Sequence, residues 1–127
     1  MEIYIYKDYS EWMSDNPSEV LEGSVEFFRN GTVFIDTTYE YKGYRQILSM
    51  EKIFAVVYKM PSGFMAYHRE INVYTDMEAW RESNPQVTFE GEICEDQCTA
   101  GHATFITTEG YKQIISLNKV FAVTYER

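Results

Sequence analysis

The stretch EIYIYKDYSEWMSDNPSEVLEG, residues 2–23, is matched without a gap by EINVYTDMEAWRESNPQVTFEG, residues 70–91. A second match lies at the other end of each copy. GYRQILSMEKIFAVVYK, residues 43–59, aligns with GYKQIISLNKVFAVTYE, residues 110–126. Self-similarity that covers most of a chain is the signature of a repeated structural unit. The sequence therefore predicts two copies of one folded unit.

The chain has 127 residues, which divide into unit 1 over 1–59, a bridge over 60–69, and unit 2 over 70–127. A unit of this size buries its core poorly when alone. We therefore expect one compact two-repeat domain, in which the units pack about a pseudo-twofold axis. The bridge contains the apolar run FMAYH, which is expected on the joint between the units or as an extension of the first strand of unit 2.

Each unit begins with an alternating, β-rich segment, which predicts a strand. A short helix follows, capped by Asp8 in unit 1 and by Thr75 or Asp76 in unit 2, and it ends before a proline. After the next strand, Asn30-Gly31 favours a type I′ hairpin turn, and a second turn is expected at Lys42-Gly43. The predicted fold class is α+β, with two tandem strand-helix-antiparallel-sheet repeats.

The chain is strongly acidic, with 20 acidic and 11 basic side chains and a formal net charge of −9. Such a protein is repelled by nucleic acid and by anionic membrane surfaces, so we expect a positively charged protein partner and no direct contact with nucleic acid. No apolar run approaches the roughly 18 residues needed to span a bilayer, and the first residues do not resemble a signal peptide. With only two cysteines, we expect a cytoplasmic protein.

The acidic residues concentrate in the helix and the following strand of each unit, which predicts two acidic ridges related by the repeat. Such ridges could occupy a basic groove, as phosphates do, and would speed association with a basic partner. The simpler interpretation is a solvated face that aids solubility. The candidate partner-binding residues are Glu11, Asp15, Glu19, Glu22, Glu78, Glu82, Glu90 and Glu92.

Tyrosine is unusually frequent, with 11 residues, and several lie at alternating positions of predicted strands. Tyrosine suits half-buried pleated surfaces, and it also anchors protein interfaces because it has few rotatable bonds. Both interpretations stay open. The clustered residues are Tyr4, Tyr6, Tyr39, Tyr41 and Tyr44.

The segment CEDQCTAGH places Cys94, Cys98 and His102 close together in sequence. Thiolate and imidazole are zinc ligands, and Asp96 or His68 could complete the set. The spacing matches no strong zinc signature and unit 1 has no counterpart, so a long hairpin loop with two thiols is the favoured interpretation. No metal or cofactor is predicted.

Three functional classes remain. The favoured one is a non-enzymatic acidic protein-binding module, of the kind in which a phage or mobile element inhibits a CRISPR or restriction nuclease by occupying its basic site. The alternative is a small-molecule or zinc-binding protein with a site at the repeat joint or at Cys94, Cys98 and His102. An enzyme with a site in that joint is the third, but no catalytic motif supports it.

Overall fold

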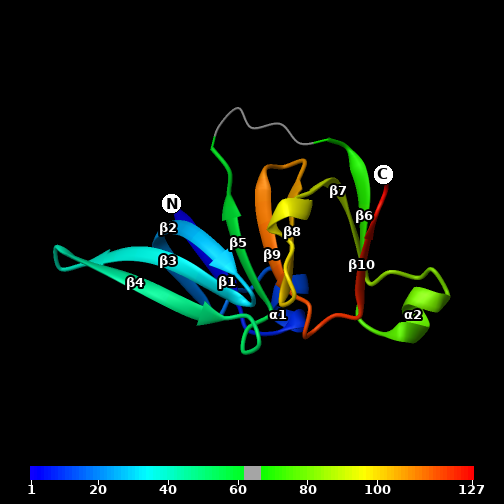
Figure 1. Ribbon diagram of the computed structural model, residues 1–127, viewed down its shortest axis with the longest axis horizontal. Helices are drawn as coiled ribbons and strands as arrows, with labels where there is room; N and C mark the ends of the chain where they lie inside the picture. The colour runs from blue at the N-terminus through cyan, green and yellow to red at the C-terminus, as the bar shows by residue number, and fades with distance from the viewer. Residues whose placement is uncertain (62–66) are drawn as a thin grey trace.

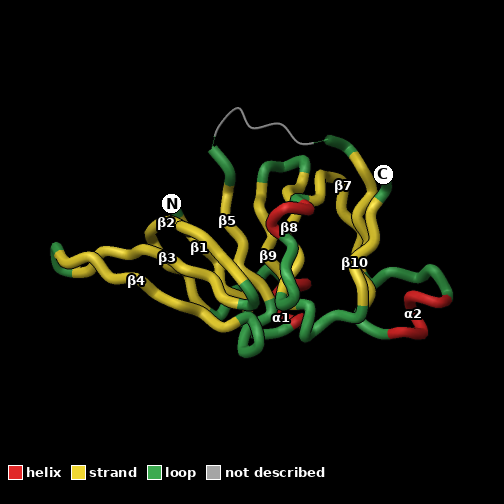
Figure 2. The backbone as a smooth tube through the Cα atoms, viewed as in Figure 1, coloured by secondary structure: helices red, strands yellow, loops and turns green. Residues whose placement is uncertain are grey.

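The computed structural model describes residues 1–61 and 67–127, without the side chains of residues 27 and 28. Residues 62–66, which are half of the bridge and include most of its apolar run, therefore lie outside the described residues. The described chain forms ten strands in one antiparallel sheet, with two short helices beside it (Figures 1 and 2). The strands are β1 (Glu2–Tyr6), β2 (Glu19–Arg29), β3 (Thr32–Tyr39), β4 (Lys42–Ser49), β5 (Ala55–Lys59), β6 (Arg69–Tyr74), β7 (Val87–Ile93), β8 (His102–Thr107), β9 (Tyr111–Ser116) and β10 (Ala122–Tyr125).

The predicted α+β class is wrong, because the structure is mostly β. The helices α1 (Tyr9–Met13) and α2 (Met77–Arg81) have five residues each, and a 3₁₀ turn spans Glu95–Gln97. A helix of little more than one turn forms few internal hydrogen bonds and depends on its caps and on packing. The helices therefore decorate the sheet and do not form a layer of their own.

The strand order is β10-β6-β7-β8-β9-β5-β1-β2-β3-β4. The first five strands in this order belong to the second half of the chain, and the last five belong to the first half. Both halves follow the same pattern, in which the fifth strand lies beside the first. The halves are joined edge to edge, because β5 pairs with β9 in antiparallel fashion over residues 55–59 and 111–115.

The cores of the two halves lie on opposite faces of this sheet. Val56 and Ile114 are paired and pack into the core of the first half, whereas their neighbours Ala55 and Ile115 are paired and pack into the core of the second. Neighbouring residues in a strand point to opposite faces. The predicted packing about a pseudo-twofold axis is also wrong, because a pure twofold rotation would bring the same strand of each half together, whereas β5 pairs with β9. The halves are related by a half-turn about an axis that crosses the strands, together with a shift along that axis.

Local sequence predicted one of the two hairpin turns of the first half correctly and misplaced the other. Asn30 and Gly31 have φ angles of 44° and 86°, as a type I′ turn requires. The turn expected at Lys42-Gly43 lies two residues earlier, at Glu40 and Tyr41, whose φ angles are 49° and 65°. This correction has a physical cause: the β3·β4 ladder pairs Lys42 with Tyr39 and leaves only two residues to turn the chain.

The helix caps follow the repeat. The Asp8 side chain accepts a hydrogen bond from the backbone N–H of Glu11 at 2.9 Å, and Asp76 accepts one from Ala79 at 2.8 Å. Asp76, and not Thr75, is therefore the cap of α2. In the described part of the chain, neither α-helix is long and apolar enough to cross a membrane.

Candidate functional site: an aromatic pocket at the joint between the halves

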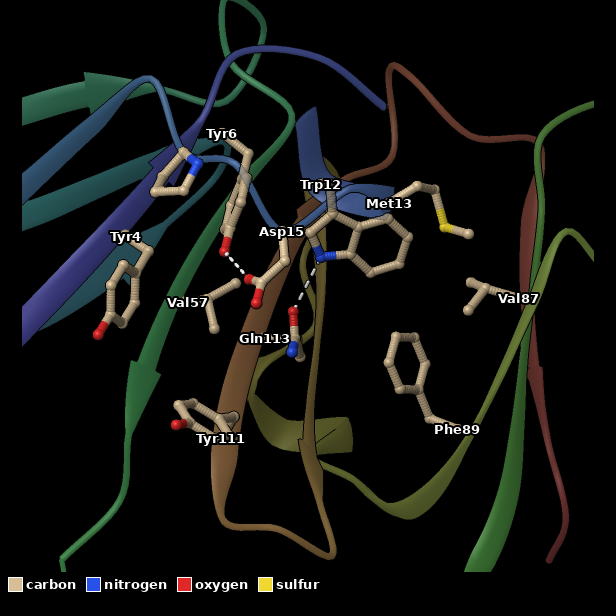
Figure 3. Close-up of a pocket in the computed structure, with 11 residues that line it drawn as sticks. Tyr4, Tyr6, Trp12, Met13, Asp15, Val57, Val87, Phe89, Tyr111 and Gln113 are labelled. Atoms are coloured by element: carbon tan, nitrogen blue, oxygen red, sulfur yellow. Dashed lines mark hydrogen bonds between the residues drawn. The ribbon is translucent and has the colours of Figure 1, made fainter. Parts of the chain in front are cut away.

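The joint between the halves contains a pocket of about 450 Å³, shown in Figure 3. It lies over the β5·β9 pairing, and α1 with the loop after it forms one wall. Five aromatic rings line it, together with one carboxylate and one amide. The lining residues are Tyr4, Tyr6, Trp12, Met13, Asp15, Pro17, Val57, Val87, Phe89, Tyr111 and Gln113.

Trp12 connects the two halves at this pocket. The ring stands 5.1 Å from the Phe54 ring of its own half and 5.6 Å from the Phe89 ring of the other half, measured between centroids. Its indole Nε1 donates a hydrogen bond to the Oε1 atom of Gln113 at 3.0 Å. A buried indole N–H needs such an acceptor. The pocket wall is thus held rigidly across the joint.

Asp15 supplies the carboxylate of the pocket. It follows α1 with φ at 56°, a left-handed conformation that aspartate tolerates better than most residues. The Tyr6 hydroxyl donates a hydrogen bond to Asp15 Oδ1 at 2.9 Å. Burial, followed by this contact, raises the pKa of Tyr6 well above its ordinary value. Tyr6 is therefore a neutral donor that orients the carboxylate, and the second carboxylate oxygen is left to meet a ligand.

The rings of Tyr4 and Tyr111 lie on the side of the pocket away from Trp12 and Phe89 (Figure 3). Tyr4 belongs to β1 and Tyr111 to β9, so both halves contribute. The Lys59 ammonium lies 4.6 Å from the centroid of the Tyr111 ring, and its Nζ donates to the backbone oxygen of Glu109 at 2.9 Å. The Lys59 ammonium thus makes a cation–π contact with one tyrosine ring at the edge of the site.

The structure places the acids of the first predicted ridge in several different surroundings. The carboxylate of Glu11 accepts hydrogen bonds from the Ser18 hydroxyl and from the Lys7 backbone N–H. These contacts lower its pKa, which gives this side chain a structural role at the end of α1. Asp15 lies in the pocket. Glu19 and Glu22 are exposed on β2, on opposite faces of the sheet because they are three positions apart.

The acids of the second half also separate. Glu78 and Glu82 are exposed on and just after α2. Glu90 lies 3.6 Å from His68. Glu92 lines a second hollow of about 850 Å³, which carries side chains of both charge signs. Of the eight predicted residues, Asp15 alone lines the aromatic pocket.

The alternative of a zinc site at Cys94, Cys98 and His102 depends on a cluster of metal-ligating side chains. Within residues 1–61 and 67–127, no group of three or more His, Cys, Asp or Glu side chains is placed to hold a metal ion. His102 is fully buried in β8, where the Thr99 hydroxyl lies 3.4 Å from its Nδ1 atom. The Cys98 thiol donates to the Cys94 backbone oxygen at 3.3 Å, and burial raises the pKa of both thiols. These are the properties of structural thiols.

Sequence reasoning missed most of the pocket. Alternation along β1 places Tyr4 and Tyr6 on one face, and this signal was present in the sequence. The contribution of Gln113 and Phe89 depends on the joint between the halves, which no local pattern encodes. No known protein family, curated protein or solved structure matches this chain.

Proposed function

We propose that this chain is a non-enzymatic protein-binding module that holds a basic side chain of its partner in the aromatic pocket. The observation that carries the proposal is the composition of the pocket wall. Aromatic rings surround a single carboxylate, Asp15, and the lining residues include no lysine, arginine or histidine. Such a wall attracts a cation through ring faces and through one negative charge.

An arginine side chain fits this chemistry best. Its planar guanidinium stacks on aromatic rings and also pairs with a carboxylate in two parallel hydrogen bonds. Tyr6 holds the Asp15 carboxylate in place, so less freedom is lost when a guanidinium binds. The backbone around the pocket is tied to the sheet, and the site needs little rearrangement on binding.

Charge supports a basic macromolecule as the partner. The net charge of −9 attracts a positively charged protein over long distances and raises the rate of encounter. Enzymes that handle nucleic acid present basic grooves, and a CRISPR or restriction nuclease remains the proposed type of partner. The separate placement of the predicted acids favours capture of a basic side chain in the pocket over a continuous row of phosphate-like charges.

The direct test measures binding of an arginine-rich peptide, with the same peptide containing citrulline as the uncharged comparison. Binding is followed by the NMR signal of the Trp12 indole N–H. We expect the arginine peptide to shift this signal and Asp15→Asn to weaken binding about tenfold, the scale of a partly desolvated cation site. The asparagine side chain keeps an oxygen for the Tyr6 hydroxyl, so the fold is retained.

The matched control is Glu82→Gln, which removes the same charge from an exposed position beyond α2. Its affinity for the peptide is expected to stay within about twofold of the parent value, because an exposed distant charge is screened. Equal losses in both variants would show unspecific charge attraction and overturn the pocket as the site. So would equal binding of the citrulline peptide.

A further inference from the structure

The two outer edges of the sheet have the sequences of the two strands that form its central joint. The free edges are β4 and β10, which lie at opposite ends of the sheet (Figure 1). β4 reads KGYRQILS and corresponds to β9, YKQIIS. β10 reads AVTY and corresponds to β5, AVVYK. Inside the chain, β5 and β9 pair with each other, so, among the residues that the structure describes, each free edge lacks the neighbour that its counterpart has.

Exposure of the matching side chains follows this difference. Ile114 of β9 is fully buried, whereas Ile47, its counterpart in β4, is 62% exposed. Phe54 is 1% exposed and its counterpart Phe121 is 43% exposed. Large apolar side chains at both free edges are thus exposed to solvent. Their counterparts are covered by the pairing of β5 with β9.

We propose that β4 of one molecule pairs with β10 of a second copy of this chain, in the register of the internal β5·β9 joint. The repeat alignment fixes this register. The expected antiparallel partners are Leu48 with Ala122, Ile47 with Val123, Gln46 with Thr124, Arg45 with Tyr125 and Tyr44 with Glu126.

The backbone phase of both edges fits this register. On β4, Met50 N–H donates to the Gly31 oxygen, so the alternation of antiparallel bonds turns Leu48 and Gln46 toward β3. The backbone N–H and C=O groups of Ile47 and Arg45 therefore point away from β3, toward the free edge. The bond from Glu126 N–H to the Glu70 oxygen fixes β10 in the same way.

Alternation along β10 turns Thr124 toward β6 and leaves the backbone groups of Val123 and Tyr125 pointing outward. The proposed register places these outward groups opposite the outward groups of Ile47 and Arg45. A shift of one residue would instead set outward groups against inward ones. The two edges are thus complementary in bonding phase as well as in sequence.

Trp80 gives a second, independent indication. Its counterpart Trp12 is 9% exposed and donates to Gln113 of the joined half, whereas Trp80 is 46% exposed. Trp80 already stands on its own phenylalanine, with ring centroids 5.5 Å apart from Phe121, as Trp12 stands on Phe54. In the proposed pairing, Gln46 of the second copy takes the place of Gln113.

Charged residues on β4 do not block this pairing. Lysine and arginine on an edge strand often prevent strand addition. However, Lys112, the counterpart of Arg45, is 7% exposed within the internal joint, 6.0 Å from the Tyr58 ring centroid. A cation at this position is therefore compatible with a paired strand.

Two changes between the copies add charge complementarity. Within the chain, Lys59 lies against the turn at Glu109. At the free edges, Glu126 stands in the position of Lys59, and Lys42 in the position of Glu109. The proposed pairing therefore brings the Glu126 carboxylate and the Lys42 ammonium to the same end of the joint.

The assembly is open-ended. The half-turn and shift that relate the two halves keep the strand order, so the surfaces that meet are different. A contact between two different surfaces continues into rows unless its rotation closes a ring. Two successive half-turns restore the original orientation, so each added copy leaves β4 and β10 free at the ends of the row.

The first test is sedimentation of the purified full chain over a range of concentrations. The weight-average mass is expected to rise with concentration, and Ile47→Glu is expected to weaken association at least tenfold. Val20→Glu is the matched control, because Val20 is 42% exposed on an inner strand. Association unchanged by Ile47→Glu, or a monomer at every concentration, would overturn the proposal.

The second test identifies the edges. Tyr44→Cys protein is mixed with Glu126→Cys protein under mild oxidation. By analogy with Lys59 and Tyr111, this is a non-hydrogen-bonded pair, in which side chains approach closely. We expect a cross-linked dimer from the mixture and not from either variant alone. A cross-link from Tyr44→Cys alone would show a symmetric β4·β4 contact and contradict the head-to-tail pairing.

Discussion

At the scale of single residues, the repeat retains a glycine at one position, Gly23 and Gly91, where a Cβ atom would strike the backbone of the neighbouring strand. A Cβ atom at Gly91 would lie 2.0 Å from the Ile106 backbone oxygen, and one at Gly23 would lie 2.1 Å from the Asp36 oxygen. Both glycines occupy the same place in their halves, at the end of the EG pair. Their conservation between the copies is therefore explained by backbone contact and not by a turn.

We predict that Gly91→Ala lowers the free energy of unfolding by about 3 kcal/mol, since backbone atoms must move to admit the methyl group. Gly43→Ala is the control, because a Cβ there meets no atom within 4 Å. Its effect should stay within about 0.5 kcal/mol. Urea denaturation followed by circular dichroism measures both. Equal stability of the two variants would mean that β7 and β8 are not paired as described.

His102 gives the protein a defined pH response. Burial lowers its pKa from the ordinary value of 6.5, because the charged form is poorly solvated inside β8. Below pH 6.5 the unfolded chain binds a proton that the folded chain does not. The stability from neutral His102 is therefore fully present above pH 6.5 and is lost as the pH falls from 6.5 through the lower folded-state pKa.

We predict a decrease in unfolding free energy of at most about 1.4 kcal/mol per pH unit within this window. The variant His102→Gln should lack this slope, even if it is less stable overall. Chemical denaturation at several pH values between neutrality and the range where carboxylates titrate provides the measurement. An identical slope in both proteins would assign the effect to other groups.

At the scale of elements, the turns show how far local sequence determines structure. Asn30-Gly31 was predicted from the residues themselves, since both accept positive φ. Glu40 and Tyr41 adopt positive φ as well, although neither is suited to it. The ladder between β3 and β4 imposes this conformation. The sequence predicted the turn at Gly43, whereas the pairing of β3 with β4 places it at Glu40 and Tyr41.

This mismatch predicts a stabilising change. Replacing Glu40-Tyr41 by Asn-Gly should raise the free energy of unfolding by about 1 kcal/mol, because it removes strain from two left-handed positions. Tyr41 is fully exposed, so little packing is lost. Tyr41→Ala removes the same ring without relieving the strain and should change little. A thermal melt compares them, and destabilisation by Asn-Gly would contradict the assigned turn.

The candidate site was partly predictable for the same reason. Alternation in β1 placed Tyr4 and Tyr6 on one face. The acids were predicted from their concentration in the helix and the following strand of each unit, and of these eight residues Asp15 alone lines the pocket. Gln113 and Phe89 arrive from a strand order that depends on contacts distant in sequence. Propensity and periodicity describe single strands and carry no information on which strand becomes the neighbour.

At the scale of the whole molecule, duplication was recognised from the sequence, but its geometry was not. Two small units can cover their apolar faces by packing face to face or by extending one sheet. Pairing of β5 with β9 achieves the second and turns one half over relative to the other. The same relation leaves β4 and β10 uncovered, so internal architecture and proposed assembly rest on a single type of joint.

Amide hydrogen exchange distinguishes the paired strand from the free edge, because Ile114 and Ile47 occupy the same position in two copies of one strand. We predict slow exchange at Ile114 at every protein concentration. At Ile47 we predict fast exchange in dilute solution and increasing protection as the concentration rises. Rapid exchange at Ile114 would contradict the internal joint, and exchange at Ile47 independent of concentration would contradict the pairing of β4 with β10.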